Sequence, residues 1–180
     1  YSGFGSFVSI AGDVNNDGFD DIVVGDPDNT DTFSVQGAAY VYLGSSSGID
    51  TSSEVKLTAS DASVTHYFGN AVANAGDLNG DGYDDVVVGA SNDDDTATNA
   101  GAVYVYYGSS TGIDSSTEEK ILASDGAADD QFGAIVAPLG DANNDGYGDL
   151  LVTSYEGSSS SYTGAVYVYY GSSTGLDTTT

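Results

Sequence analysis

The stretch Asp13-Val-Asn-Asn-Asp-Gly-Phe-Asp-Asp21 occurs twice more in the chain with few changes. Its second copy is Asp77-Leu-Asn-Gly-Asp-Gly-Tyr-Asp-Asp85 and its third is Asp141-Ala-Asn-Asn-Asp-Gly-Tyr-Gly-Asp149, so successive copies start 64 residues apart. A Phe-Gly pair precedes each copy and a Tyr-Val-Tyr run follows it. Self-similarity at a fixed period is the signature of repeat architectures. We therefore predict three tandem repeats, at residues 1–60, 61–124 and, incomplete, 125–180.

Each repeat contains short runs of β-branched and aromatic residues between clusters of Gly, Ser, Asp and Asn, a pattern typical of β-strands. The predicted strands lie at residues 7–11, 22–24, 39–43 and 54–57 in the first repeat, 71–75, 86–88, 102–107 and 118–122 in the second, and 134–139, 150–152 and 165–170 in the third. The frequent Gly and β-branched residues argue against helices.

The second predicted strand of each repeat is apolar at consecutive positions, as in Val86-Val-Val, which indicates that both of its faces are covered. Four-stranded blades stacked face to face, as in a β-propeller, cover both faces in this way. The first strand is rich in small residues, which suit the crowded inner strand of a radial array. A sandwich of two antiparallel sheets is the alternative, but the fixed four-strand period favours blades.

The predicted fold class is therefore all-β, with three tandem four-stranded antiparallel blades of β-propeller type. The third blade lacks its outer strand, which would begin just after Thr180. Three blades are too few to close a ring, since propellers have about four to eight. We expect other copies of the chain, or flanking repeats of a longer polypeptide, to cover the open faces. The absence of an initiating Met and of a signal segment favours the longer polypeptide.

The composition excludes several classes of protein. The 180 residues hold 28 Asp and Glu against 2 Lys and Arg, giving a formal net charge of −26, so phosphate groups of nucleic acids and anionic membranes would be repelled. There is no Cys to form disulfides, and no apolar run long enough to cross a membrane. The 14 Tyr and 6 Phe distinguish the chain from acidic disordered tails. We expect the carboxylates to hold cations, or the protein to work in salty water, or both.

The acidic loop between the first two strands of each repeat has the pattern D-x-N-x-D-G-x-x-D. Oxygen ligands at positions 1, 3, 5 and 9, with a backbone carbonyl at position 7, give the six or seven oxygens that Ca²⁺ prefers. Gly at position 6 permits the tight reversal that turns the ligands inward. We predict three Ca²⁺ ions per chain. The ligands would be Asp13, Asn15, Asp17, Phe19 and Asp21; Asp77, Asn79, Asp81, Tyr83 and Asp85; and Asp141, Asn143, Asp145, Tyr147 and Asp149, with Phe19, Tyr83 and Tyr147 contributing backbone carbonyls.

Other interpretations of this loop are weaker. An EF-hand needs a Glu at position 12 and flanking helices, whereas position 12 here is Val and the flanks are predicted strands. An Asx-rich turn without an ion could explain one loop, but three copies with the same three Asp and one Asn argue against it. Mg²⁺ is the weaker candidate ion because it prefers fewer protein ligands and strict octahedral geometry.

Taken together, Phe4-Gly5 before the first strand, the acidic loop, Gly25-Asp-Pro after the second strand and the Gly-x-x-Tyr-Val-Tyr strand resemble the FG-GAP repeat of integrin α-subunit β-propellers and their prokaryotic extracellular relatives. The resemblance covers nearly the whole chain. It departs from the pattern at Thr153-Ser-Tyr155, where the first two repeats have Gly25-Asp-Pro and Gly89-Ala-Ser. The resemblance implies calcium-bound blades on extracellular or cell-surface proteins, often serving adhesion, with the loop carboxylates binding the ion.

Several residues outside the loops have simpler interpretations. His66, the only histidine, is interpreted as a packing or surface residue, and the Tyr-rich third strands as blade packing rather than sugar-stacking surfaces. The Asp residues after the second strands, such as Asp93-Asp-Asp95, are interpreted as solvated loops, with an extra cation site as the alternative. Lys56 and Lys120 occupy equivalent positions on the fourth strand, where a charge would discourage edge pairing.

The predicted function is a calcium-binding, secreted or cell-surface module for adhesion or ligand binding, in which Ca²⁺ makes the loops rigid. One alternative is a structural subunit of an extracellular filament or surface layer. A second is a carbohydrate-binding or carbohydrate-active module. Because the chain has no Cys, no Arg and one His, and no general base is singled out beyond the loops, we expect no enzymatic activity. Expected partners are further copies or flanking repeats, and a cell-surface protein or glycan.

Overall fold

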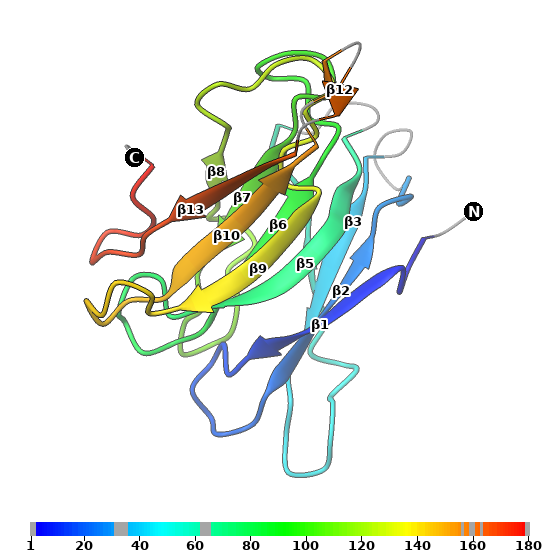
Figure 1. The fold of residues 1–180 in the computed structure, drawn as a ribbon. Coiled ribbons are helices and arrows are strands. Elements are labelled where there is room, and N and C mark those ends of the chain that lie inside the picture. Colours follow the sequence, from blue (N-terminus) through cyan, green and yellow to red (C-terminus); the bar gives the residue numbers. More distant parts are fainter. Residues whose placement is uncertain are drawn as a thin grey trace.

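The computed structural model describes residues 3–30, 36–61, 66–155, 157–158, 161–162 and 164–178 (Figure 1). In these ranges the chain forms β-strands and loops without a helix, so it contains no helix that could span a membrane. The strands assemble into three antiparallel sheets that stack without closing into a ring. The all-β prediction is confirmed.

The three sheets correspond to the three predicted blades. Blade 1 consists of β1 (Phe7–Gly12), β2 (Asp21–Asp26), β3 (Ala38–Tyr42) and β4 (Val55–Leu57) in that order. Blade 2 consists of β5 (Phe68–Gly76), β6 (Asp85–Ala90), β7 (Ala102–Tyr106) and β8 (Glu119–Ile121). Blade 3 consists of β9 (Ile135–Gly140), β10 (Asp149–Ser154) and β13 (Ala165–Tyr169), in the order β13-β10-β9. The missing outer strand of blade 3 is therefore as predicted.

The structure adds one element that the sequence did not predict. Strands β11 (Gly157–Ser158) and β12 (Ser161–Tyr162) pair with each other in the connection between β10 and β13. Hydrophobic periodicity could not detect them, because each is two residues long and three of the four residues are Ser or Gly.

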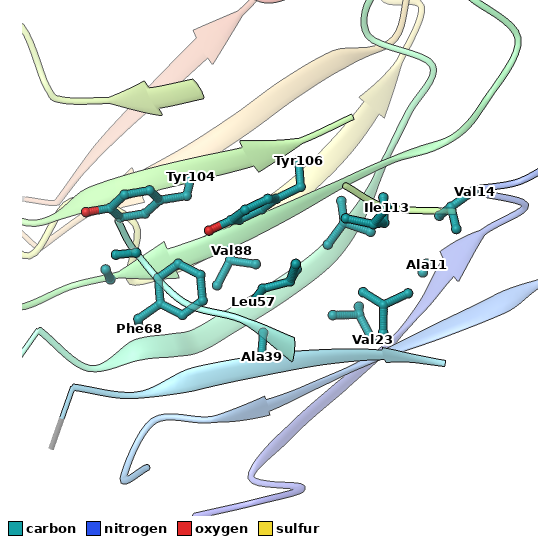
Figure 2. Packing of buried hydrophobic residues seen from close by; sticks show 14 of the residues in the cluster. Ala11, Val14, Val23, Ala39, Leu57, Phe68, Val88, Tyr104, Tyr106 and Ile113 are labelled. Carbon is teal, nitrogen blue, oxygen red and sulfur yellow. The ribbon is translucent and has the colours of Figure 1, made fainter. Parts of the chain in front are cut away.

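The blades pack face to face around two hydrophobic cores. The first core lies between blades 1 and 2, where Val23 and Leu57 face Phe68, Val88 and other blade 2 residues (Figure 2). The second core joins the opposite face of blade 2 to blade 3. Strand β6 is consequently buried along its whole length, which confirms that the consecutive apolar residues of the second strand are covered on both faces. Strand β5 lies between β1 and β9, so the small-residue strands run side by side (Figure 1).

The Phe of each Phe-Gly pair packs where two blades meet. Phe68 and Phe132 are fully buried, and each meets a tyrosine of its own blade edge to face, Phe68 with Tyr104 and Phe132 with Tyr167, at ring-centroid distances of 5.3 and 5.2 Å. Each Phe also forms a parallel backbone bridge to a glycine of the preceding blade. Phe4 makes the same edge-to-face contact with Tyr40 but is 52% exposed.

Glycine is required beside each Phe-Gly pair because the two backbones nearly touch. A Cβ on Gly25 would lie 2.1 Å from the carbonyl oxygen of Gly69, and a Cβ on Gly89 would lie 2.2 Å from that of Gly133. Both distances are far below any real contact between a Cβ and an oxygen. The glycine near the end of the second strand, Gly25 in β2 and Gly89 in β6, therefore sets how closely the next blade can approach.

We predict that Phe68→Ala lowers the free energy of unfolding by about 3–5 kcal/mol, the usual cost of truncating a buried Phe. The matched control is Phe4→Ala, which removes the equivalent side chain from a half-exposed position and should cost clearly less. Urea denaturation followed by tyrosine fluorescence would measure both. Equal losses for the two variants would show that burial between blades is not what makes Phe68 important.

Candidate metal-binding loops

The three predicted metal-binding loops connect β1 to β2, β5 to β6 and β9 to β10. They lie next to one another, since the Asp84 amide donates to the Asp13 carbonyl and the Gly148 amide donates to the Asp77 carbonyl. The structure thus places all the predicted ligands in a row of three neighbouring loops.

Inside the first loop, the side-chain oxygens at positions 1, 3 and 5 turn toward the backbone of the loop. The Asp13 carboxylate accepts hydrogen bonds from the amides of Asp17 and Gly18 at 2.9 and 2.8 Å. The Asn15 Oδ1 accepts from the Asp17 amide at 3.1 Å, and the Asp17 Oδ1 accepts from the Phe19 amide at 3.0 Å. The second and third loops repeat these bonds, which brings three oxygen-bearing side chains together in each loop.

The Asp at position 9 is buried and anchors each loop to its blade. The two oxygens of Asp21 accept the amides of Val14 and Gly44 at 2.8 and 2.7 Å, so one carboxylate joins the loop to the turn after β3. Asp85 and Asp149 make the equivalent pairs of bonds and, like Asp21, have no exposed surface.

The environment of Asp85 and Asp21 disfavours the charged form of their carboxylates. Burial raises the pKa of Asp85 to about 7, although hydrogen bonds from the Gly108 and Leu78 amides oppose the shift and the nearby Asp81 and Asp77 add to it. Burial likewise raises the pKa of Asp21, with Asp13 and Asp17 contributing. A divalent cation bound in the loop would offset the repulsion between these neighbouring carboxylates directly.

The fourth position of the loop carries a constraint that the sequence pattern left open. Asn16, Gly80 and Asn144 all have left-handed backbone, with φ of 54°, 74° and 61°. Gly and Asn are the residues that adopt this conformation at least cost. The sequence signal for this constraint was that the fourth position is Asn, Gly and Asn in the three loops. The glycines at position 6 also have positive φ, which confirms the predicted reversal.

An aspartate at position 8, outside the predicted ligand set, links the first two loops. The Asp84 carboxylate accepts the Asp13 amide at 2.9 Å, and a Cβ on Gly12 would lie 2.1 Å from its oxygen, so Gly12 makes room for it. The third loop has Gly148 at this position, and its amide donates to the Asp77 carbonyl of the second loop, while the Tyr147 ring lies against Gly80.

The loops fit a hard divalent cation by the chemistry of their donors. Each offers carboxylate and amide oxygens at positions 1, 3, 5 and 9, the ligands that Ca²⁺ prefers. The hydrogen bonds that these oxygens accept do not exhaust them, since each oxygen has two lone pairs. The backbone carbonyls of Phe19, Tyr83 and Tyr147 belong to the same loops and remain predicted ligands.

A separate acidic cluster lies at the junction of blades 1 and 2. One ligand atom each of Asp61, His66 and Asp93 lie within 4.8 Å of one another, a grouping that could hold a metal ion. Lys120 brings its own cation to this place: its Nζ lies 2.6, 2.8 and 2.7 Å from carboxylate oxygens of Asp61, Asp93 and Asp95. The cluster is therefore an ammonium site built from the chain itself.

Asp93 needs a correction, because it is fully buried rather than solvated. His66, interpreted as a packing or surface residue, is a packing residue: it is only 2% exposed, and its Nδ1 lies 3.5 Å from the Asp93 carboxylate. Lys120 does more than discourage edge pairing, because its one charge contacts three carboxylates from two different connections. The spacing of these residues along the chain gave no sign of the cluster, because they come from β8 and from two separate connections and meet only in the folded structure.

The opposite charges in this cluster shift the pKa values of Lys120 and Asp61. Burial alone would lower the pKa of Lys120, but the three carboxylates raise it above its usual value. Burial likewise opposes ionisation of Asp61, but hydrogen bonds from Lys120 and Tyr104 lower its pKa below the usual 3.8. Blade 1 has a related arrangement in which Lys56 reaches the neutral Asn29, its Nζ 3.3 Å from Oδ1.

We predict that Lys120→Met destabilises the protein by about 3 kcal/mol, because removing one partner leaves the buried Asp93 carboxylate without its cation. Lys56→Met is the matched control and should cost less, since the position of Asp93 is occupied by Asn29 in blade 1 and the loss of Lys56 leaves no buried carboxylate at that position. Thermal unfolding at neutral pH measures both. The Asp61 contribution, present above its unfolded pKa of 3.8, should disappear as the pH falls through its lower folded pKa. A Lys120→Met variant as stable as the control would contradict the assignment.

Comparison with known proteins agrees with this geometry. The FG-GAP repeat model matches residues 4–42, 68–106 and 132–169, which correspond to the first three strands of each blade. Among curated proteins, the chain is 33% identical to integrin alpha-4 of Xenopus laevis over 153 residues, covering 84% of this chain and 14% of the integrin.

Two further relatives are integrins. The chain is 36% identical to integrin alpha pat-2 of Caenorhabditis briggsae over 160 residues, covering 80% of this chain, and 41% identical to integrin alpha-6 of Gallus gallus over 107 residues, covering 57%. It spans 13% and 9% of the length of these two proteins. With three matched repeats on three stacked four-stranded or three-stranded blades, the chain belongs to the FG-GAP repeat family.

Proposed function

We propose that this chain is a calcium-binding module of an extracellular or cell-surface protein, and that it serves adhesion or ligand binding without enzymatic activity. The observation that carries the proposal is the acidic loop, present three times with the same inward-turned oxygens and the same buried Asp at position 9. Each loop would bind one Ca²⁺ through the side chains at positions 1, 3, 5 and 9 and the carbonyl at position 7.

The role of the ion follows from where the loops sit. Each loop is tied to its own blade by the buried carboxylate and to the adjacent loop by backbone hydrogen bonds. An ion that fixes one loop would therefore also stiffen the contact between neighbouring blades. Without ions, three carboxylates per loop repel one another within a chain whose net charge is already −26.

The proposed location and role rest on the relatives. Integrin alpha chains from a frog, a bird and a nematode match most or about half of this chain. A module of the same family, with no Cys and a strongly acidic surface, suits an environment rich in calcium or salt. We propose a cell-surface protein or glycan as its ligand.

We predict that the chain takes up three Ca²⁺ ions. Isothermal titration of chelator-treated protein should give a stoichiometry of three, and excess Ca²⁺ should raise the melting temperature because the ion binds only the folded loops. Asp145→Asn, at position 5 of the third loop, should weaken one site and reduce the number of tight ions to two. Asp94→Asn, which removes an exposed carboxylate outside the loops, is the matched control and should leave three.

Two results would contradict this proposal. Chelator-treated protein that takes up no calcium would exclude the ion sites. If Asp145→Asn and Asp94→Asn lowered the calcium stoichiometry equally, the ion would be attracted by the acidity of the whole chain and not by the loop. The adhesive role needs a different measurement. Calcium-loaded protein immobilised on beads should capture a ligand from an array of cell-surface proteins and glycans, and chelation should release it.

A further inference from the structure

Three polar side chains of blade 1 meet on the outer half of the sheet. Asp26 is the last residue of β2, Asn29 follows it in the connection to β3, and Lys56 is the middle residue of the outer strand β4. The strand register places Lys56 opposite Tyr40 and Asp26 opposite Ala38, two residues before Tyr40 on β3. Because residues two apart along a strand share a face, Asp26, Tyr40 and Lys56 lie on the same face of blade 1.

The side-chain amide of Asn29 is held at both ends. Its Oδ1 accepts a hydrogen bond from the Lys56 Nζ at 3.3 Å. Its Nδ2 donates to the Asp26 Oδ2 at 3.2 Å and to the Tyr40 hydroxyl oxygen at 3.1 Å. The Cγ of Asn29 therefore lies between an amine on its oxygen side and a carboxylate on its nitrogen side.

The surroundings of these groups limit their contact with water. Asp26 is 3% exposed and Tyr40 is 9% exposed, while Asn29 and Lys56 are half-buried. The Lys56 Nζ lies 5.7 Å from the centroid of the Tyr40 ring, and Phe4 packs edge to face on the same ring. A lysine amine that is partly desolvated is a better nucleophile than a fully hydrated one.

Blade 2 has the same lysine with different partners. Lys120 also lies over a tyrosine ring, but Asp93 stands in the place of Asn29 and Ala90 in the place of Asp26. Lys120 is consequently held by three carboxylates as an ammonium ion, which has no lone pair to donate. Blade 1 differs from blade 2 at both positions, and the two differences together combine an amine, an amide and a carboxylate.

We propose that blade 1 forms an intramolecular isopeptide bond between the Lys56 Nζ and the Asn29 Cγ, with Asp26 as the catalytic acid and base. A side-chain amide normally resists attack by an amine, but groups fixed in contact react at effective concentrations of about 10⁵ M or more. The bond ties β4, which is only three residues long, to the connection between β2 and β3. It provides a covalent cross-link in a chain that has no Cys, and it does not depend on calcium.

The reaction replaces one amide by another. Lys56 reacts as the neutral amine, after one proton has passed to water, and the lone pair of its Nζ forms the new bond to Cγ. The Asp26 carboxylate, which already contacts Nδ2, moves one proton from Nζ to Nδ2. The bond between Cγ and Nδ2 then breaks, its electron pair stays on the nitrogen, and ammonia leaves. Nothing is oxidised or reduced, and the ammonia takes up the proton that was released at the start.

Intact mass and trypsin digestion of the full chain test the proposal. Lys56 and Lys120 are the two basic residues of the chain, so trypsin should cut the unfolded, unbonded protein after each of them. An isopeptide-bonded lysine is not a trypsin site. Wild-type protein that has been folded should therefore yield fragments 1–120 and 121–180, and its intact mass should be lower than the sequence mass by one ammonia.

Matched variants separate the roles of the three residues. Lys56→Arg keeps the positive charge without the amine, so it should retain the full mass and be cut at both sites. Asp26→Asn keeps the amine and the amide but lacks the acid and base, and should slow bond formation in freshly synthesised protein by about 100-fold or more. Lys120→Arg should still lose one ammonia.

The same bond affects the control for Lys120→Met, because Lys56→Met would remove it. The two methionine variants should therefore be compared in an Asp26→Asn background, in protein whose intact mass shows that the bond is absent.

Three results would count against the proposal. Folded wild-type protein with the full sequence mass, cut by trypsin after Lys56, would overturn it without the need for any variant to fold. A loss of ammonia that persists in Lys56→Arg would overturn it as well, because Asn29 would then have cyclised on its own backbone as a succinimide. Bond formation at the wild-type rate in Asp26→Asn would exclude Asp26 as the catalytic acid and base. A fragment 1–120 in which Lys56 and Asn29 are joined, identified by tandem mass spectrometry, would confirm the bond.

Discussion

The contact on which the stack depends is the approach of one blade's backbone to the next at the Phe-Gly turn. The amides of Phe68 and Phe132 donate to carbonyls of the preceding blade, Gln36 and Ala100, at 3.2 and 2.8 Å. Because the backbones come so close, the aromatic ring enters the core between the sheets and pairs with a tyrosine there. Hydrogen bonding, burial and the requirement for glycine are thus consequences of a single close approach, repeated at both junctions.

The excess of negative charge is arranged so that most of the buried carboxylates have a defined partner. Asp21, Asp85 and Asp149 each receive two backbone amides, one on each oxygen, so that neither oxygen of the buried carboxylate lacks a hydrogen bond. Asp93 receives Lys120 instead. The two kinds of partner have different effects. Backbone amides that belong to a loop fix the shape of that loop, whereas Lys120 on the outer strand joins two separate connections.

Much of the fold could be predicted from the sequence because the same pattern of residues occurs in each repeat. Strand positions, blade count and the missing outer strand of blade 3 agree with the structure, since β-branched runs between turn residues are a local signal. The loop ligands were predicted from the same repeated pattern and remain a prediction. The Asp61–Lys120 cluster within the second repeat and the Asp84 bridge between the first and second loops could not be found, because each brings together residues that lie far apart along the chain.

Where the three copies differ, the structure gives the difference a cause. Asn29 replaces the aspartate that pairs with Lys120, and the lysine of blade 1 then reaches a neutral oxygen. Gly148 replaces Asp84, and the second and third loops are joined by a backbone hydrogen bond without a carboxylate bridge. Thr153 replaces a glycine on a face where no following Phe-Gly turn is packed. In each case, positions that are identical between the copies have the same neighbours, and positions that differ have different neighbours. A residue that differs between copies therefore gives information about the surroundings of its blade, which the identical residues do not give.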